Sequence, residues 1–196
     1  MAVSEQAFLM VLAGLSGSGK TTIADHVAKE LSRKHNMSVV VLDSDPVRKD
    51  ILGVPHTTRL GEDAYAWDIT KKVIAEMDKR TTDYLSKSTS VILTSILVEE
   101  AHRKEKQNFA ENCHVPFIGL WLDAPEQILL QRVEKRSQQN TDASDANVAV
   151  VKKQIQAQES ITDWPKINSD RSVEDIVQDV IEMMPLSLTE NRIGCG

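Results

Sequence analysis

Cysteine is scarce in this chain, and so is excess positive charge. The only two cysteines, Cys113 and Cys195, show no C-x-x-C spacing, so we expect neither a disulfide nor a zinc site. Lysine and arginine total 23 against 29 aspartates and glutamates, which gives a net charge of −6. This balance argues against a protein that binds nucleic acid through bulk positive charge.

Long apolar runs are missing as well. No segment approaches the length that spans a membrane, and the acidic N-terminus lacks the basic start of a signal peptide. We therefore expect a cytoplasmic protein without membrane contact. The length of 196 residues suits one α/β domain over residues 1–196, with a flexible tail at about 186–196. The sequence leaves open whether the protein is a monomer or a homodimer.

The most informative segment is residues 14–21, which we call the glycine loop. It matches the phosphate-binding pattern G-x-x-x-x-G-K-[ST] at every specified position. The apolar run 8–13 before it predicts a buried strand, and Ile23, Val27 and Leu31 after it recur as one face of a helix. A strand, a glycine loop and a helix in this order favour a phosphate site over a plain glycine-rich turn.

The residue types of this loop predict ATP and Mg²⁺ as cofactors. Its glycines let several main-chain N–H groups point at phosphate oxygens, and the helix N-terminus adds partial positive charge. Lys20 is expected to reach the β- and γ-phosphates, and the Thr21 hydroxyl to bind Mg²⁺. The predicted nucleotide-binding residues are Gly14, Leu15, Ser16, Gly17, Ser18, Gly19, Lys20, Thr21 and Thr22.

Apolar segments and helical patterns alternate along the rest of the chain. Further strands are expected at 38–42, 91–93, 117–122 and 165–168. Helices are expected from about 64 to 86, 99 to 112, 126 onward, 148 to 155 and 173 to 184. Val73, Ile74 and Met77 are expected on the inner side of the first, and Trp67 in the core or in a pocket wall. This pattern predicts an α/β fold in three layers, a parallel five-stranded sheet with helices on both faces. Ligands of such sheets bind beyond the carboxyl ends of the strands.

A second group of candidate residues follows the second predicted strand. Asp43 and Asp45 are two apart in an extended segment, so both carboxylates can face the same site. Phosphoryl transfer to an alcohol needs an acid near Mg²⁺ and a second one to accept the hydroxyl proton. We assign Asp43 to the metal and Asp45 to the acceptor, with Arg48 as an acceptor contact. The alternative is that Asp43 or Asp45 caps the following helix.

These residues resemble those of the small P-loop kinases of the nucleotide-kinase-like superfamily. The glycine loop with Thr22, followed by Leu42-Asp43-Ser44-Asp45, is similar to adenylylsulfate and shikimate kinases. Segments 53–60, 119–125 and 142–146 are similar to a group of predicted ATP-binding kinases, and gluconate kinases belong to the same superfamily. The resemblance runs from about Phe8 to Val180. It departs at Thr94-Ser95, where the predicted kinases often carry an aspartate.

The resemblance also implies a helical lid over the phosphates, at about 132–147. Within it Arg132 and Arg136 are four residues apart on one helical face, and we expect at least one to stabilise the transferring phosphoryl group. Arg132 and Asp170 are the expected contacts on the nucleotide side, because related kinases pass the base beyond the last strand. Asp142 and Asp145 are expected to shape the lid or to cap the helix after it.

The function predicted from these residues is a phosphotransferase that moves the γ-phosphate of ATP to an alcohol. The acceptor would be a small polar metabolite, a sugar or a sugar-like antibiotic, with Arg59 as a further candidate contact. One alternative is an adenylylsulfate kinase or a toxin-like nucleotide-sugar kinase, although the acceptor segment of adenylylsulfate kinases is absent. Another is an ATP-binding switch without catalysis.

Overall fold

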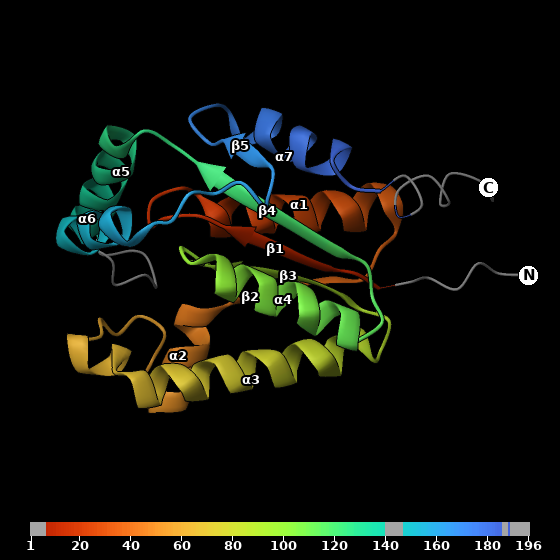
Figure 1. Ribbon diagram of the computed structural model, residues 1–196, viewed down its shortest axis with the longest axis horizontal. Coiled ribbons are helices and arrows are strands. Elements are labelled where there is room, and N and C mark those ends of the chain that lie inside the picture. Colours follow the sequence, from red (N-terminus) through yellow and green to blue (C-terminus); the bar gives the residue numbers. More distant parts are fainter. Residues whose placement is uncertain (1–6, 140–146, 186–187, 189–196) are drawn as a thin grey trace, which may run out of the picture.

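The computed structural model describes residues 7–139, 147–185 and 188, and its centre is one parallel sheet (Figure 1). Within this part of the chain the sheet has five strands in the order β2-β3-β1-β4-β5, and every neighbouring pair is parallel. The fold class predicted from the sequence is confirmed. The strands are β1 (Leu9–Ala13), β2 (Val39–Asp43), β3 (Ser90–Ser95), β4 (Phe117–Asp123) and β5 (Lys166–Asn168).

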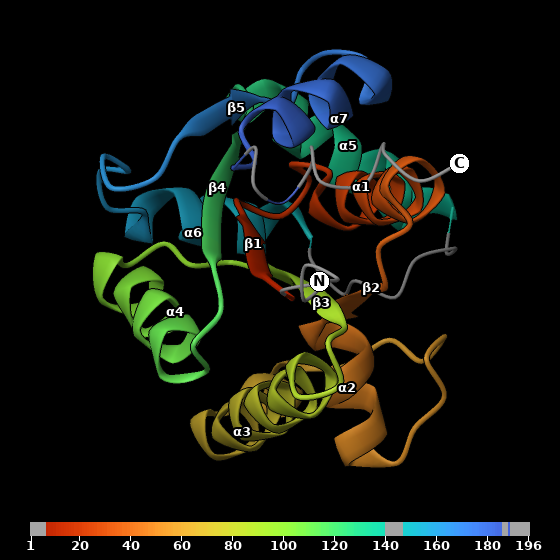
Figure 2. The same cartoon turned by 90° about the vertical axis from the view of Figure 1, so that its right-hand side faces the viewer.

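Helices cover both faces of the sheet, as Figure 2 shows. α1 and α7 lie on one face, and α3 and α4 lie on the other. The helices are α1 (Lys20–His35), α2 (Ser44–Leu52), α3 (Trp67–Leu85), α4 (Glu100–Asn112), α5 (Glu126–Gln139), α6 (Val148–Ala157) and α7 (Val173–Glu182), with a 3₁₀ helix η1 at Glu62–Tyr65.

The core lies in two layers because successive side chains of β1 point to opposite faces. Leu9 and Val11 pack with the apolar residues of α3 to α6, whereas Met10 and Leu12 pack with those of α1 and α7. All four side chains have 0% exposure. A strand that is apolar on both faces is what a sheet covered by helices on each side requires.

Two expectations for α3 were wrong. Val73 and Met77 are buried as predicted, but Ile74 is 43% exposed. Ile74 is one residue, and therefore about 100°, further round the helix than Val73, which turns it away from the core. Trp67, expected in the core or a pocket wall, is 62% exposed at the first position of α3, with the Lys71 ammonium over its ring.

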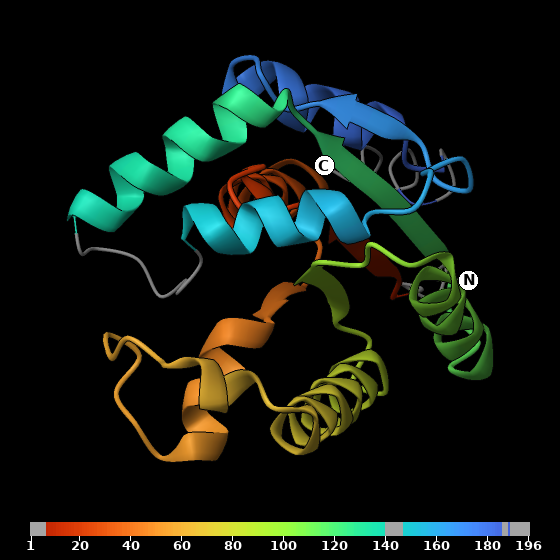
Figure 3. The ribbon, with the colours of Figure 1, turned by 60° about the vertical axis from the view of Figure 1, so that its left-hand side comes forward.

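The carboxyl ends of the strands meet at one end of the molecule. There α5 and α6 lie on one side and α2 with the 53–66 segment lies on the other (Figure 3). The predicted lid includes residues 140–146, which lie outside the described residues, as does the predicted tail at 186–196 apart from Leu188. Among the helices of the described part, none is long and apolar enough to cross a membrane.

Candidate active site

The glycine loop connects β1 to α1 and packs closely against α5. Gly17 has a φ of +88°, in the region that favours glycine. A Cβ added to Gly17 would lie 2.7 Å from the main-chain oxygen of Leu129 and 3.1 Å from the Val133 side chain. Any side chain at this position would force the loop and α5 apart.

The start of α1 is left open for an anion. Its N-cap residue, Gly19, supplies no side-chain hydrogen bond, and its first turn holds no acidic residue. The first N–H groups of a helix have no partner within the helix, so they are available to phosphate oxygens.

Lys20 is half-buried at this helix start, and its ammonium donates to the main-chain oxygen of Leu15 at 2.9 Å. Burial lowers the pKa of Lys20 to about 8, against the opposing influence of the Asp43 and Asp45 carboxylates, and the nearby Arg136 lowers it further. Both acids and one lid arginine are thus close enough to affect the charge of this lysine.

Asp43 ends β2, and each of its carboxylate oxygens has a separate task. Oδ1 accepts from the main-chain N–H of Asp45 at 2.9 Å and so caps α2. Oδ2 accepts from the hydroxyls of Thr21, at 2.9 Å, and Thr94, at 2.5 Å. The helix cap, which was an alternative to a metal-binding role in the sequence analysis, is therefore present, and it leaves the second oxygen of the same carboxylate for the metal role, which stays a prediction. Thr94 is 1% exposed and pairs in register with Asp43, so it orients that carboxylate.

The Thr21 hydroxyl and Asp43 carboxylate fit a magnesium ion. Their oxygens lie 2.9 Å apart, and neighbouring ligands of an octahedral Mg²⁺ with bonds of about 2.1 Å are separated by about 3 Å. No cluster of three or more histidine, cysteine or acidic side chains occurs in the described part of the chain. Such a site suits Mg²⁺, which is held by one or two carboxylates together with substrate phosphates.

A cavity beside the loop brings together most of the predicted catalytic residues. Lys20, Asp43, Asp45 and Arg136 all line it, although they come from four separate elements, α1, β2, α2 and α5. Two cationic side chains and two carboxylates therefore line one cavity at the carboxyl end of the sheet. The complete lining is Ser16, Gly17, Gly19, Lys20, Thr21, Thr22, Asp43, Ser44, Asp45, Pro46, Thr94, Ser95, Ile96 and Arg136.

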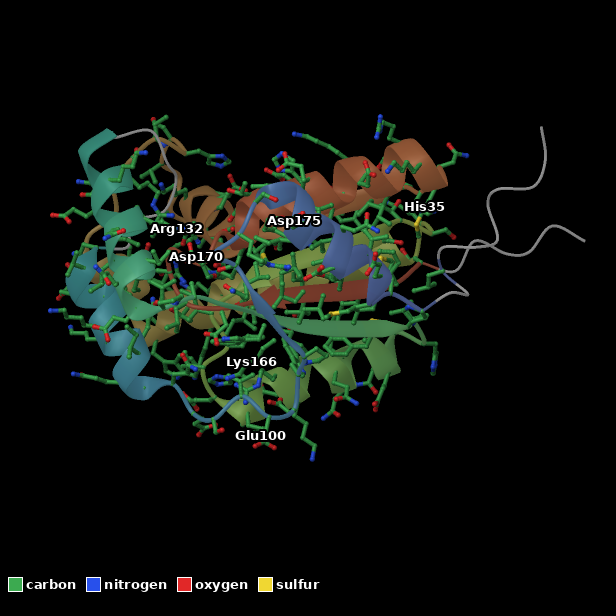
Figure 4. The ribbon with its side chains drawn as sticks, turned by 90° about the horizontal axis from the view of Figure 1, so that it is seen from above. His35, Glu100, Arg132, Lys166, Asp170 and Asp175 are labelled. Atoms are coloured by element: carbon green, nitrogen blue, oxygen red, sulfur yellow. The ribbon has the colours of Figure 1, made fainter. Side chains whose placement is uncertain are left out.

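A second cavity opens on the other side of the loop. Arg132 lines it together with Ser18 of the loop and Ser169 after β5. Arg132 donates to the main-chain oxygens of Ser169, at 3.0 Å, and Gly17, at 3.4 Å, and lies 3.7 Å from the Asp170 carboxylate. Figure 4 shows Arg132 and Asp170 together at this edge. The two lid arginines thus face different cavities.

The two arginines predicted to contact the acceptor lie outside both cavities. Arg48 is 6% exposed, donates to the Ala64 main-chain oxygen at 2.8 Å and stacks on the Tyr65 ring at 4.5 Å. Arg59 donates to the Ser137 hydroxyl at 3.0 Å and thereby links the 53–66 segment to α5. Their contact with an acceptor stays a prediction.

A glutamine that the sequence analysis missed holds the loop from the other side. Gln154 of α6 forms two hydrogen bonds with Ser16. No spacing rule points to residues 138 positions apart, so the sequence carried no signal for this pair. The helix after the lid was expected to be capped by Asp142 or Asp145, which lie outside the described residues; its cap is Asn147, whose side chain accepts from the Val150 N–H.

Comparisons with known proteins agree with the fold. A family model described as "AAA domain" matches residues 9–161. The probable gluconokinase of Dictyostelium discoideum is 23% identical over 186 residues, which are 92% of this chain and 88% of that protein. The adenylyl-sulfate kinase of Myxococcus xanthus is 28% identical over 125 residues, 64% of this chain, and the match spans only 62% of that protein.

Among solved structures, the APS kinase of Mycobacterium tuberculosis in complex with AMPPNP and APS has a similar fold. The TM-score is 0.68 at 20% identity, over 90% of this chain and 96% of that one. At this identity the likeness establishes the shared fold, and the substrate of this chain is a separate question.

Proposed function

The chain belongs to the AAA domain family of P-loop proteins, and from that premise we propose that it is an ATP- and Mg²⁺-dependent phosphotransferase. It moves the γ-phosphate of ATP to an alcohol group of a small polar metabolite, a sugar or a sugar-like compound. The observation that carries the proposal is the cavity shared by Lys20, Asp43, Asp45 and Arg136. Kinases among the relatives support the same reaction class.

The two cavities fit the two ends of the nucleotide. The cavity that contains Arg132, Ser169 and Val173 has planar, main-chain and apolar surfaces, which suit the base and ribose. The cavity on the other side contains Lys20 and Arg136, which suit the β- and γ-phosphates. The glycine loop lies between them, so its N–H groups bind the connecting phosphates.

Each charged residue of the phosphate cavity has a role in transfer. Lys20 and Arg136 stabilise the charge on the moving phosphoryl group, which has little covalent chemistry with the protein. Thr21 and Asp43 would hold Mg²⁺, which when bound neutralises charge on the phosphate oxygens. Thr94 keeps Asp43 oriented through its hydrogen bond to the same oxygen, Oδ2, that accepts from Thr21.

Asp45 is the proposed general base. Its carboxylate lines the cavity at the start of α2, two residues past the Asp43 cap of that helix. From there it orients the acceptor hydroxyl and takes its proton as the oxygen attacks phosphorus. A nucleotide-operated switch needs no such second acid, which favours catalysis over the switch.

The experiment that tests this proposal measures ADP production with and without a panel of polyols, sugars and aminoglycosides. At least one acceptor is expected to stimulate turnover. Asp45→Asn then lowers kcat by about 10²–10⁴, the usual worth of a general base, while AMPPNP affinity stays within about threefold. Asp83→Asn, an exposed acid on α3, is the matched control and should behave as wild type.

The outcome that contradicts a kinase is specific. If AMPPNP binds tightly, no acceptor raises ADP production, and Asp45→Asn leaves the basal ATP turnover unchanged, the protein is a nucleotide-binding switch.

A further inference from the structure

Gln154 makes a two-point contact with Ser16 that fixes the direction of every hydrogen bond between them. The Ser16 main-chain N–H can only donate, so it must meet the amide oxygen Oε1, at 2.9 Å. The other end of the same amide is then the NH₂ group, which donates to Ser16 Oγ at 3.1 Å. Ser16 Oγ is therefore an acceptor toward Gln154, and its own proton must point elsewhere.

The cavity on the phosphate side is where that proton can point. Ser16 lines the cavity that contains Lys20 and Asp43, whereas Ser18, two residues on, lines the cavity on the base side. A nucleotide whose base occupies the second cavity therefore reaches Ser16 with the far end of its phosphate chain. Ser16 is at the terminal phosphate, and phosphate oxygens accept hydrogen bonds.

The helix that carries Gln154 is fixed in position by core packing and by a cap at its start. Val151 of the same helix has 0% exposure in the core, and the Asn147 side chain caps the helix start. Gln154 is half-buried and lies on the side of α6 that faces the loop. A side chain in this setting keeps its amide direction because turning it over would place its NH₂ group against the Ser16 main-chain N–H, two donors facing each other.

We propose, on the basis of the function proposed above, that Gln154 is a positioning residue that presents the Ser16 hydroxyl to the γ-phosphate. Ser16 Oγ donates its proton to a γ-phosphate oxygen, and Gln154 prevents that proton from being used within the protein. The pair therefore distinguishes a triphosphate from a diphosphate. Gln154 does not contact the nucleotide.

The test compares the affinities of ADP and AMPPNP, both with Mg²⁺, by calorimetry. Ser16→Ala should lower the affinity for AMPPNP by about tenfold or more, which is the contribution of one hydrogen bond to a charged group. The affinity for ADP should stay nearly unchanged. Gln154→Glu should act in the same direction, because its carboxylate accepts the Ser16 proton and repels the γ-phosphate. Gln156→Ala, an exposed glutamine on the same helix, is the control.

A double variant separates positioning from support of the fold. Gln154→Ala should weaken AMPPNP selectively in the wild-type background and add little in the Ser16→Ala background, since the two residues act through one hydrogen bond. If Gln154→Ala weakens the binding of ADP and AMPPNP equally, the contact with Ser16 only supports the fold. If it leaves both affinities unchanged, the contact has no role in nucleotide binding. Either result overturns the proposal. If the wild-type protein binds neither nucleotide, the proposed function fails, and this inference fails with it.

Discussion

At the scale of single residues, Asp43 links the stability of a helix to the chemistry of the site. One carboxylate oxygen caps α2 and the other meets Thr21 and Thr94. An asparagine would keep an acceptor for the cap but would lose the negative charge that Mg²⁺ needs. The same residue type therefore satisfies a local folding preference and the requirement of the proposed magnesium site.

Lys20 gives a prediction about pH. Because burial lowers its pKa to about 8, the nucleotide-free protein loses this positive charge above that pH. Phosphates bind the protonated lysine, so nucleotide binding takes up a proton there, and AMPPNP affinity should fall by about tenfold per pH unit above about 8. Calorimetry at pH 7 and pH 9, in two buffers of different ionisation enthalpy, measures both effects.

The control for this pH effect is Lys20→Arg, whose guanidinium stays charged throughout the range. Its AMPPNP affinity should change little between pH 7 and pH 9, even if it is weaker overall. The same decline in wild type and Lys20→Arg would assign the effect to another group.

At the scale of one element, α5 divides its two arginines between the two cavities. Arg132 and Arg136 are one turn apart, yet Arg132 lines the cavity with Ser169 and Arg136 the cavity with Lys20. Under the proposed function, one helix would then contact both the base end and the phosphate end of the nucleotide.

Separate kinetic effects follow for the two arginines. Arg136→Ala should lower kcat by about 10³ or more, since a transition-state arginine contributes about 10³–10⁵. Arg132→Ala should mainly raise the KM for ATP, because its contacts are made before the reaction. Steady-state kinetics check both, with Lys135→Ala, an exposed neighbour on α5, as the control. A change in kcat below about threefold for Arg136→Ala would assign this side chain to the solvated face of α5.

The helices and strands show how much of the fold could be predicted from the sequence. β1 to β4 were predicted because each contains an apolar run, whereas β5 has only Ile167 as a buried apolar residue; the glycine loop was predicted because its pattern and both flanks agree. The order of the strands in the sheet could not be predicted, because an apolar run does not indicate which other strand it pairs with. The placement of the Arg48 side chain could not be predicted either. A long side chain near Asp45 can reach several partners, and in the structure it packs on the Tyr65 ring.

The candidate site was predictable where its residues are close in sequence to the loop or to a strand end. Lys20, Asp43 and Asp45 fall into one cavity because parallel strands end at one edge of the sheet. Gln154 and Thr94 were missed or assigned differently because their roles arise from tertiary contacts. Thr94 was noted only as a departure from the aspartate of the predicted kinases, and its hydrogen bond goes to Asp43.

At the scale of the whole molecule, a buried arginine connects three distant segments. Arg103 of α4 has 0% exposure, donates to Leu97 after β3 at 2.8 Å, and pairs with Asp163, before β5, at 2.8 Å. Burial alone would raise the pKa of Asp163, but the hydrogen bond and charge of Arg103, together with main-chain hydrogen bonds at Asp163 and Thr162, outweigh burial and lower that pKa. This ion pair therefore stabilises the fold above the ordinary aspartate pKa, and the stabilisation is lost as the pH falls through the lowered value.

Removing Asp163 should consequently destabilise the protein more than removing a surface partner does. Asp163→Ala leaves a buried charge unpaired and is expected to cost about 3–5 kcal/mol of unfolding free energy. Asp179→Ala, which breaks the exposed pair with Arg171, should cost about 0–1 kcal/mol. Urea unfolding at pH 7 measures both. Equal costs for the two variants would refute the structural role of Arg103.

The tight seating of Gly17 on Leu129 has a mechanical consequence. Because no atom separates the loop from the backbone of α5 there, that contact is a fulcrum for any rocking of the helix. Arg136 is seven residues beyond Leu129, a lever arm of about 10 Å. A tilt of only about 10° would then move the base of the Arg136 side chain by nearly 2 Å, several times the margin of about 0.5 Å between a formed and a broken hydrogen bond.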